Sequence, residues 1–354
     1  MYFECINCNT SVDAHISISL CTHCVYPLTI RHNGDPEMQT NNEAVTLGEG
    51  HSKMITLAKV ANSLGVSKIY AKLENSNPTG SFKDRGSSAM LSAIKSAGIS
   101  SIVEDSSGNA GASIAAYAAL AGITAHIFVP ENAPKAKVDQ ILVYGANVHK
   151  IPGHRDNAEI QAKNFASEQK LLYASHNINP YFLEGTKSFA REVVTEFEPN
   201  LPDHIIIPVG NGSLLISTYL VLKECWVSGN ISKIPKLYAV QSESIKPIVS
   251  RLHNIGWSFN PEQNTCADGI ASLNPPRMKQ IVNSIIKTKG DSIGVSEESI
   301  QKHHRLVAEN EGIYMEPTSA VSFAGLEALV NNKTIDSGDS VLIPITGSGL
   351  KSST

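Results

Sequence analysis

Short runs of β-branched and other apolar residues alternate with longer helical segments along most of this chain of 354 residues. Runs such as Ile205-Ile206-Ile207 and Ile127-Phe128-Val129 are typical of parallel strands buried on both faces of a sheet. Strands are predicted at 67–74, 101–104, 124–129, 146–151, 204–208, 236–240 and 340–344. Helices are predicted at 86–97, 110–121, 134–144, 156–169, 185–197, 214–227, 297–311 and 318–331. From about residue 45 onward, this alternation predicts an α/β fold with open parallel sheets, in which ligands bind at the carboxyl ends of strands.

The N-terminal segment carries four of the six cysteines, as the pairs Cys5-Ile-Asn-Cys8 and Cys21-Thr-His-Cys24. Two CxxC pairs can place four thiolates tetrahedrally, which is the arrangement that structural Zn²⁺ prefers. Asn9 can adopt the left-handed backbone conformation that a metal-binding turn often needs. The alternatives are a redox-active CxxC and two disulfides, and a chain without a secretory signal disfavours disulfides. We therefore predict a structural zinc module at residues 1–38, closed by the turn Asn33-Gly34-Asp35-Pro36.

The charge balance excludes several classes of partner. The chain has 29 Lys and Arg against 33 Asp and Glu, for a net charge of −4, so no basic excess indicates nucleic acid or an anionic membrane. Residues 1–38 contain Arg31 and no lysine, which is a poor electrostatic footprint for a nucleic-acid-binding zinc module. No apolar run approaches the length of a membrane span, and the N-terminus lacks the pattern of a secretory signal. We expect a cytoplasmic protein.

Lys83 is the first candidate catalytic residue. It lies in the segment Asn-Pro-Thr-Gly-Ser-Phe-Lys-Asp-Arg-Gly at 77–86, directly after a predicted strand. A lysine whose charge is suppressed by burial becomes a nucleophilic amine, which forms a Schiff base with an aldehyde. The aldehyde cofactor that proteins use in this way is pyridoxal 5′-phosphate (PLP). A single lysine is more often a solvated surface residue, so the prediction depends on the other motifs.

Three further motifs follow predicted strands, and each has a structural alternative. Asp105-Ser-Ser-Gly-Asn-Ala-Gly-Ala-Ser113 opens a helix, where backbone N–H groups bind anions such as a carboxylate, but Ser and Asn also serve as plain caps. Pro208-Val-Gly-Asn-Gly-Ser-Leu214 can cradle a phosphate, or it is a tight βα turn. Pro344-Ile-Thr-Gly-Ser-Gly-Leu-Lys351 offers a hydroxyl to a ring nitrogen, or it is a C-terminal turn.

Taken together, these motifs resemble those of the fold-type II PLP enzymes, and most closely the threonine synthase branch. The resemblance covers about residues 45–351, and the cysteine pairs resemble zinc ribbons found ahead of some of these synthases. It implies a tryptophan synthase β-like fold with the cofactor in a cleft between two parallel-sheet α/β domains, and a homodimer. The implied domains are the zinc ribbon at 1–38, a large PLP-binding domain at 39–104 and 185–354, and a small α/β domain at 105–184. The segments that carry it are 77–86, 106–109, Asn179 with 184–187, 210–213, 316–320 and 346–351.

The resemblance also implies a role for each matching residue. Lys83 is the Schiff-base lysine and proton shuttle, Phe82 packs beside the cofactor ring, and Asn109 bonds the ring 3-oxygen. Thr346 bonds the pyridine nitrogen, and because a neutral hydroxyl cannot hold a proton there, the ring is a weaker electron sink. The cofactor phosphate is held by Gly210, Asn211, Gly212, Ser213 and the helix that Leu214 opens. The substrate carboxylate is bound by Ser106, Ser107 and Gly108.

Some positions depart from the threonine synthase pattern. Phe182 stands where that family commonly has an arginine for the substrate phosphate, and Ala110 replaces a threonine. The segment 267–271, Ala-Asp-Gly-Ile-Ala, is more similar to serine and threonine dehydratases, and the chain ends three residues after Lys351. Candidates to replace the missing phosphate ligand are Lys187, Arg155 and Asn211.

We therefore expect a PLP-dependent lyase or synthase of threonine synthase type, acting at Cβ or Cγ of a small amino acid. Threonine synthase itself, a cysteate- or cysteine-synthase-like β-replacement and a serine or threonine ammonia-lyase all fit these residues. A catalytically inactive zinc-ribbon interaction protein is the alternative of a different class, against which Lys83, Asn109 and Thr346 all argue.

Overall fold

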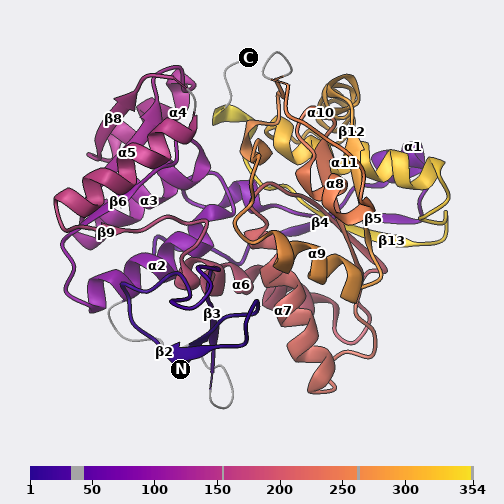
Figure 1. The fold of residues 1–354 in the computed structure, drawn as a ribbon. Coiled ribbons are helices and arrows are strands. Elements are labelled where there is room, and N and C mark those ends of the chain that lie inside the picture. Colours follow the sequence, from indigo (N-terminus) through magenta and orange to yellow (C-terminus); the bar gives the residue numbers. More distant parts are fainter. Residues whose placement is uncertain (33–43, 154, 261–263, 352–354) are drawn as a thin grey trace. The chain divides into compact units, whose positions relative to one another are not determined.

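The computed structural model describes residues 1–32, 44–153, 155–260 and 264–351 (Figure 1). The predicted turn at 33–36 lies outside the described residues. The chain forms two compact units. Unit 1 comprises Met1–Gly50, Asn77–Thr186 and Lys351–Thr354, and unit 2 comprises His51–Ser76 and Lys187–Leu350.

The N-terminal module, residues 1–32, is a small antiparallel sheet within unit 1. Its strands β1 (Tyr2–Glu4), β2 (Ser11–Asp13) and β3 (Thr29–Arg31) have the order β2-β1-β3. The module has its own small core, which combines Phe3, Leu28 and Ile30 with Cys5 and Cys21. Asn9 has a φ of 59°, the left-handed conformation predicted for it.

The rest of unit 1 is a four-stranded parallel sheet with helices on both faces. The order is β8-β7-β6-β9, from β6 (Ser101–Glu104), β7 (Thr124–Pro130), β8 (Asn147–Ile151) and β9 (Leu172–Tyr173). Alternate residues point to opposite faces, so Ile102 and Ile127 join one core while Val103 and Phe128 join another. The first core includes residues of α2 (Lys83–Ser96), α3 (Asn109–Ala121) and α4 (Lys135–Val143), and the second those of α5 (Arg155–Glu168).

Unit 2 contains a six-stranded sheet of order β12-β11-β10-β13-β5-β4. All neighbours are parallel except the edge strand β4, which pairs antiparallel with β5. The strands are β4 (Met54–Thr56), β5 (Lys68–Lys72), β10 (His204–Pro208), β11 (Lys236–Ser242), β12 (Asp291–Val295) and β13 (Ser340–Pro344). Its helices include α1 (Ala58–Leu64), α7 (Ser213–Val227), α8 (Pro247–His253), α9 (Met278–Lys287), α10 (Glu297–Glu311) and α11 (Pro317–Asn331). Helix α6 (Pro180–Phe197) begins in unit 1 and ends in unit 2.

Both parallel sheets have a topological switch point, where the chain changes the direction in which it adds strands. In unit 1 it lies between β6 and β9, because β7 and β8 follow on one side of β6 and β9 is added on the other. In unit 2 it lies between β10 and β13, for the same reason. The loops that leave adjacent strands at such a point diverge and leave a crevice for a ligand.

The seven predicted strands and eight predicted helices are confirmed, with two informative shifts at helix starts. Helix α2 begins at Lys83 instead of 86, and α6 begins at Pro180 instead of 185. The second shift arises because Asn179 Oδ1 accepts the N–H groups of Tyr181 and Phe182 and so caps the helix. The sequence analysis missed three short helices, α1, α8 and α9, the three strands of the N-terminal module, and the strands β4, β9 and β12.

The two units differ from the predicted domains mainly in residues 44–50 and 77–104, which are predicted for the large domain but belong to unit 1, as does the predicted zinc ribbon. Helix α2 and strand β6 therefore lie in unit 1. The physical reason is strand pairing, because β6 pairs with β7 on one side and β9 on the other.

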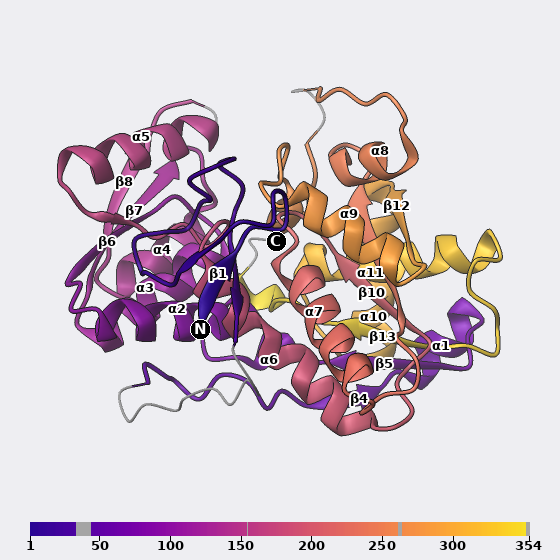
Figure 2. The ribbon, with the colours of Figure 1, turned by 60° about the horizontal axis from the view of Figure 1, so that its bottom comes forward.

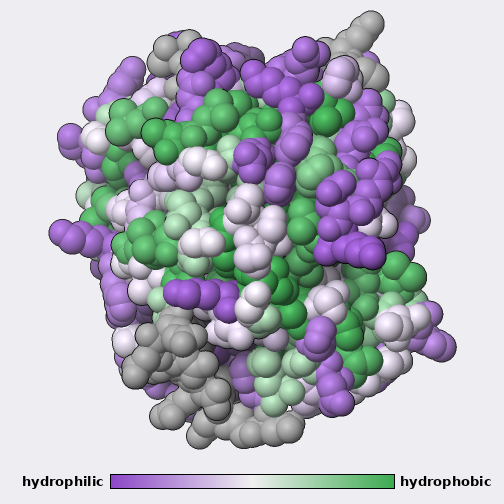
Figure 3. Space-filling view, turned by 90° about the vertical axis from the view of Figure 1, so that its left-hand side faces the viewer, coloured by the Kyte–Doolittle hydropathy of each residue, from purple (hydrophilic) through white to green (hydrophobic). Residues whose placement is uncertain are grey.

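The surface of unit 1 exposes single large apolar side chains, among them Leu120, Leu142 and Val143. On the face shown in Figure 3, hydrophobic side chains are interspersed with hydrophilic ones. Scattered exposure of this kind is normal for a folded protein. Among the described residues, no helix is both long and apolar enough to cross a bilayer.

Candidate active site

The predicted site residues divide between the two units. Unit 1 carries Phe82, Lys83 and the loop 106–109, and unit 2 carries the loop 210–214 and Thr346. In both units the loops follow strands at the switch points.

Lys83 is the first residue of α2, and its side chain is partly exposed. Its ammonium lies 4.3 Å from the centroid of the Phe82 ring, so the ring covers one side of the amine. The turn before it is closed by a 2.7 Å hydrogen bond from Gly80 N to Asn77 O. Since the positive end of a helix dipole disfavours a cation, this position suits an amine that must react as a nucleophile.

Asp84, the next residue, fixes the loop that precedes Lys83. Its buried carboxylate accepts hydrogen bonds from Thr79 N at 2.7 Å, Thr79 Oγ1 at 2.5 Å and Ser113 Oγ at 2.6 Å. Burial raises the pKa of Asp84, against these hydrogen bonds, which lower it. The Thr79 carbonyl in turn accepts from Lys351 Nζ at 2.8 Å. These bonds restrain the loop, and the sequence analysis gave Asp84 no role.

The loop after β6 begins α3 at Asn109. Ser106 and Asn109 are buried, whereas Ser107 and Gly108 are partly exposed at the end of the helix. A Cβ atom at Gly111 would lie 1.9 Å from the Ser106 carbonyl oxygen, so only glycine allows the loop to fold back on the helix. The free N–H groups of a helix start in this position can bind a carboxylate.

Beneath that loop lies a buried acidic cluster that the sequence analysis missed. Glu104 accepts from the backbone N–H of His176 at 3.1 Å and lies 2.7 Å from its ring Nδ1. Asp105 accepts from the Tyr173 hydroxyl at 2.8 Å. Burial raises the pKa of Asp105, and burial likewise raises that of Tyr173. The available signal was the pair of acidic residues at the end of the predicted strand 101–104, because charges are rarely buried without a partner.

Phe182 occupies a fully buried position in the first turn of α6, in unit 1. A Cβ atom at Gly86 would lie 2.7 Å from three of its ring carbons, so its ring lies against the first turn of α2. Its ring also meets the His176 ring edge-on, at 5.5 Å between centroids. An apolar contact therefore fills the position where the threonine synthase pattern has arginine.

In unit 2, the glycine turn at 210–213 is shaped by close contacts on both glycines. A Cβ at Gly210 would lie 2.9 Å from the Ile270 Cα, and one at Gly212, which has a φ of 81°, would lie 2.4 Å from Ile281. Ser272 Oγ donates to Asn211 Oδ1 at 2.6 Å. Ser213 then begins α7, so the turn presents its backbone at a helix N-terminus, the arrangement that suits a phosphate.

Thr346 follows β13, the strand beside β10, and is buried. Its hydroxyl donates to Glu316 Oε1 at 3.1 Å and lies 2.9 Å from Ser319 Oγ. A Cβ at Gly347 would lie 2.4 Å from the carboxyl carbon of Glu316, so glycine is required there. Glu316, directly before α11, therefore supplies the buried carboxylate that accepts from Thr346. The sequence analysis did not assign Glu316 this role.

Of the three candidates to replace the missing arginine, Lys187 is paired elsewhere in unit 2. Its buried ammonium lies 3.1 Å from Glu224 Oε1. The side chain of Arg155 lies outside the described part of the structure. Asn211 is engaged by Ser272.

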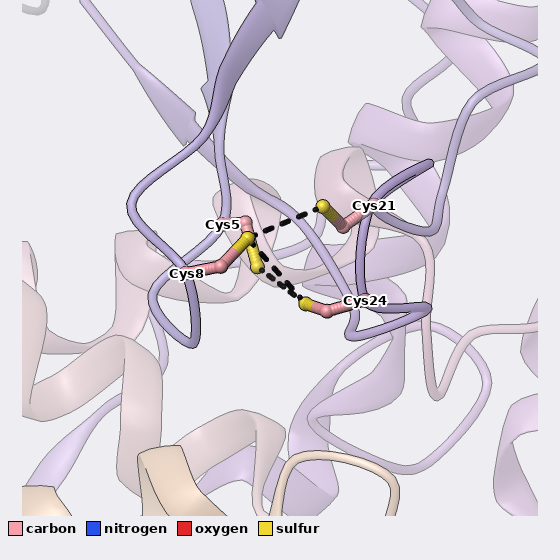
Figure 4. A group of neighbouring side chains, drawn as sticks. All are labelled: Cys5, Cys8, Cys21 and Cys24. Carbon is pink, nitrogen blue, oxygen red and sulfur yellow. Dashed lines mark hydrogen bonds between the residues drawn. The ribbon is translucent and has the colours of Figure 1, made fainter.

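The four cysteines of the N-terminal module point toward one another from two turns (Figure 4). Three sulfur–sulfur distances are 3.4 Å for Cys5–Cys24, 3.5 Å for Cys8–Cys24 and 3.6 Å for Cys8–Cys21, and all four sulfurs lie within 4.8 Å of one another. These separations exclude disulfides, whose S–S bond is about 2.0 Å. Four sulfurs bound tetrahedrally at about 2.3 Å from zinc would be about 3.8 Å apart, so the cluster fits that ion.

The cysteine thiols differ in their surroundings. Burial raises the pKa of Cys5 to about 12, whereas hydrogen bonds from Thr10 lower the pKa of Cys8 to about 6. Metal binding requires all four as thiolates, so it would release protons.

The loop after β6 in unit 1, and the turn after β10 and Thr346 after β13 in unit 2, follow strands at switch points of parallel sheets, where α/β proteins bind their ligands. Residues 45–347 match the family described as pyridoxal-phosphate dependent enzyme. The chain belongs to this family.

Individual relatives narrow the class further. Threonine synthase of Methanocaldococcus jannaschii is 34% identical over 317 residues, which cover 89% of this chain and 78% of that protein. Threonine synthase of Bacillus sp. (strain ULM1) is 35% identical over 308 residues, 87% of this chain and 85% of that protein. The solved structure of maize serine racemase has a TM-score of 0.70 at 23% identity, over 84% of this chain and 88% of that one. The fold is therefore that of fold-type II PLP enzymes, and the chain is a PLP-dependent enzyme of threonine synthase type.

Proposed function

We propose that the chain catalyses elimination or replacement at Cβ or Cγ of a small amino acid, as threonine synthase or a close paralogue. The observation that carries this proposal is the position of the predicted motifs, since the loops 105–108, 209–212 and 345–348 all leave strands at switch points. PLP, when bound, would supply the electron sink that stabilises negative charge at Cα.

Within unit 1, Lys83 would hold the cofactor through its amine and then move a proton at Cα of the substrate. Phe82 would pack beside the ring, since its own ring already lies against the lysine. Asn109 would bond the ring 3-oxygen. The start of α3, with Ser106, Ser107 and Gly108, would bind the substrate carboxylate and so orient the Cα–H bond toward the lysine.

Within unit 2, the turn of Gly210, Asn211, Gly212 and Ser213 would hold the cofactor phosphate, with Leu214 opening the helix whose dipole favours the anion. Thr346 would bond the pyridine nitrogen by turning its single hydroxyl proton from Glu316 Oε1 to the ring. A hydroxyl is a weaker partner for a protonated nitrogen than a carboxylate is, which favours prompt loss of a leaving group over transamination.

The relatives and the site residues favour different substrates. The relatives named above are threonine synthases, whose family acts on O-phosphohomoserine. Phe182, however, offers no hydrogen bond to a phosphate, and the His176 ring that it contacts lies 2.7 Å from the buried Glu104 carboxylate. This specific observation favours the second candidate, a β-replacement or β-elimination enzyme whose substrate carries an uncharged leaving group.

The test of the cofactor assignment is the variant Lys83→Ala, with Lys95→Ala, an exposed lysine of the same helix, as its matched control. The visible absorption of lysine-bound PLP is expected to disappear in the first variant and persist in the second, with both proteins folded. Borohydride reduction followed by peptide mass mapping is expected to place the pyridoxyl adduct on Lys83. An adduct on another lysine would reject the assignment.

The test of the substrate assignment is a screen of serine, threonine, O-acetyl and O-phospho esters, and O-phosphohomoserine. Phosphate released from O-phosphohomoserine together with threonine identifies threonine synthesis, a requirement for an added nucleophile identifies β-replacement, and a keto acid with ammonia identifies β-elimination. A protein that binds PLP but turns over none of these compounds would contradict the proposal.

We also propose that the cysteine quartet binds a structural Zn²⁺, because four cysteine ligands leave no open position for a substrate. Free thiols at this spacing are consistent with a reducing compartment, which supports a cytoplasmic location. A homodimer is proposed by analogy with fold-type II enzymes, and its mass in solution tests it.

A further inference from the structure

The N-terminal module contacts α6 within unit 1, through a residue of β1 and the residue that follows β3. The buried ring of Phe3, in β1, meets the Tyr181 ring edge-on at 5.7 Å between centroids. His32, directly after β3, lies with its ring Nε2 3.1 Å from Glu184 Oε1. Figure 2 shows the module's strands beside the start of α6. An aromatic contact and a polar contact therefore attach the module to the first two turns of this helix.

Tyr181 joins two cores. It packs against the core of the module and also against the core formed by α2, α3 and one face of the sheet. Because Cys5 and Cys21 belong to the same core as Phe3, the contact with Tyr181 depends on the cysteines being gathered. A module of about 30 residues with so few buried apolar side chains needs a metal to fold stably. A bound metal would thus hold the ring of Phe3 against Tyr181.

The same turns of α6 are packed tightly against the start of α2. Phe182, next to Tyr181, lies against Gly86, with 2.7 Å from a Cβ there to the ring. A Cβ at Gly185 would lie 2.2 Å from the Arg85 carbonyl oxygen and 2.6 Å from the Ala89 Cβ. Glycine on each helix permits an approach so close that neither helix can shift alone. Lys83 lies in the first turn of α2, less than one turn from both contacts.

We propose that the metal-bound N-terminal module positions Lys83. The module contacts α6 at Tyr181 and Glu184, and α6 in turn packs against the start of α2 through Phe182 and Gly185. This inference rests on the proposed function of Lys83. The structural coupling between the module and α2 does not depend on that function. Tyr181 and Glu184 are positioning residues, since neither would touch cofactor or substrate. The module is then a metal-dependent brace for the cofactor lysine, and not an independent appendage.

Hydrogen exchange gives a direct readout, because it needs neither cofactor nor activity. Removal of zinc with a chelator is expected to increase amide exchange in residues 180–186 and 83–90 as well as in 1–32, while the strands of unit 2 stay protected. Exchange that increases only in 1–32 would overturn the proposal.

Cofactor affinity gives the second readout. Tyr181→Ala, assayed with zinc bound, is expected to weaken PLP binding about tenfold and to lower kcat more than it changes KM. Tyr181→Phe keeps the ring and is expected to restore both. Removing zinc from Tyr181→Ala should weaken PLP binding little further, because both changes break the same chain of contacts from the module to α2. If the two losses of PLP affinity add fully, the module does not act through Tyr181.

The matched control is Phe165→Ala, which removes a partly buried aromatic ring from the other core of unit 1. It is expected to lower stability and leave PLP affinity unchanged. Should Tyr181→Ala fail to fold, the double variant Glu184→Gln/His32→Gln tests the polar contact alone. It is expected to weaken PLP binding by less than tenfold. Coupling in hydrogen exchange without a pyridoxyl adduct on Lys83 would reject the proposed function but retain the brace, so the two failures are distinguishable.

Discussion

At the scale of single residues, the candidate site depends on buried carboxylates that hold other groups in place. Asp84 fixes the loop before Lys83, Glu104 holds His176, and Glu316 orients Thr346. Each carboxylate interacts with at least one residue distant in sequence, and these interactions offset the cost of its burial. The sequence shows these acidic residues, but it shows none of their partners.

Gly111 tests how closely the loop 106–109 must approach α3. Gly111→Ala places a Cβ 1.9 Å from the Ser106 carbonyl oxygen, so the loop has to move, at a cost of about 1–3 kcal/mol. We expect a raised KM for the amino-acid substrate, measured together with the free energy of unfolding in urea. Gly338→Ala, whose Cβ meets nothing within 4 Å, is the control and should leave both values nearly unchanged. An unaffected KM in Gly111→Ala would show that this loop does not bind the carboxylate.

Phe182 tests the residue that departs from the threonine synthase pattern. Phe182→Arg places a charge at a fully buried apolar position against Gly86, and we expect a loss of about 3–5 kcal/mol in the free energy of unfolding. Phe182→Leu keeps the position apolar and should lose about 1–2 kcal/mol. Both are measured by urea unfolding. If Phe182→Arg instead folds normally and gains turnover of O-phosphohomoserine, the position is an open phosphate subsite.

At the scale of elements, strands β7 and β8 carry a pair of neighbouring histidines. His126 Nδ1 lies 3.1 Å from His149 Nε2, and the His149 ring stacks on Phe128 at 4.3 Å between centroids. Burial lowers the pKa of both rings, and the charge of His149 lowers that of His126 further. Both rings therefore stay neutral in the folded chain under conditions where free histidines become protonated.

This pair predicts a loss of stability in mild acid. As the pH falls below about 6.5, the unfolded chain binds protons on these histidines before the folded chain does, so the free energy of unfolding decreases until the pH reaches the lowered pKa values. We expect His126→Gln/His149→Gln to lose less stability than the parent between pH 7 and 5, in urea unfolding curves. His51→Asn, at an exposed histidine, is the control and should keep the parental slope. Equal slopes in all three proteins would remove the pair as the cause.

At the scale of the whole molecule, each unit is assembled from separate stretches of the chain. In unit 2, β5 lies between β13 and β4, so residues 68–72 pair with residues 340–344. In unit 1, the N-terminal module adds a third core to the two on the faces of the sheet. A change that disrupts the core of the module should therefore lower the stability of unit 1.

Zinc removal tests that expectation. Chelation, or Cys8→Ser, is expected to lower the thermal midpoint and to split the transition in two, with the first step in unit 1. Cys266→Ser, at a lone partly buried thiol of unit 2, is the control and should shift the midpoint little. Calorimetry measures both. Lost catalysis with an undisturbed midpoint would mean that the metal is not structural.

The sequence by itself determined the parts that depend on neighbours along the chain. Apolar periodicity located seven of the strands that the structure describes. The residues around Lys83 and the glycine turns indicated a PLP enzyme, and the CxxC spacing indicated a metal module. These signals are local because periodicity, turn geometry and ligand spacing span only a few residues.

Only the tertiary structure decided which distant residues meet. It put Glu316 beside Thr346, Glu104 beside His176 and the Phe182 ring against Gly86, and it moved residues 77–104 into the unit of the smaller sheet. Strand order fixed the two switch points. Such contacts follow from the packing of whole elements, and a single sequence does not encode that packing in any short segment.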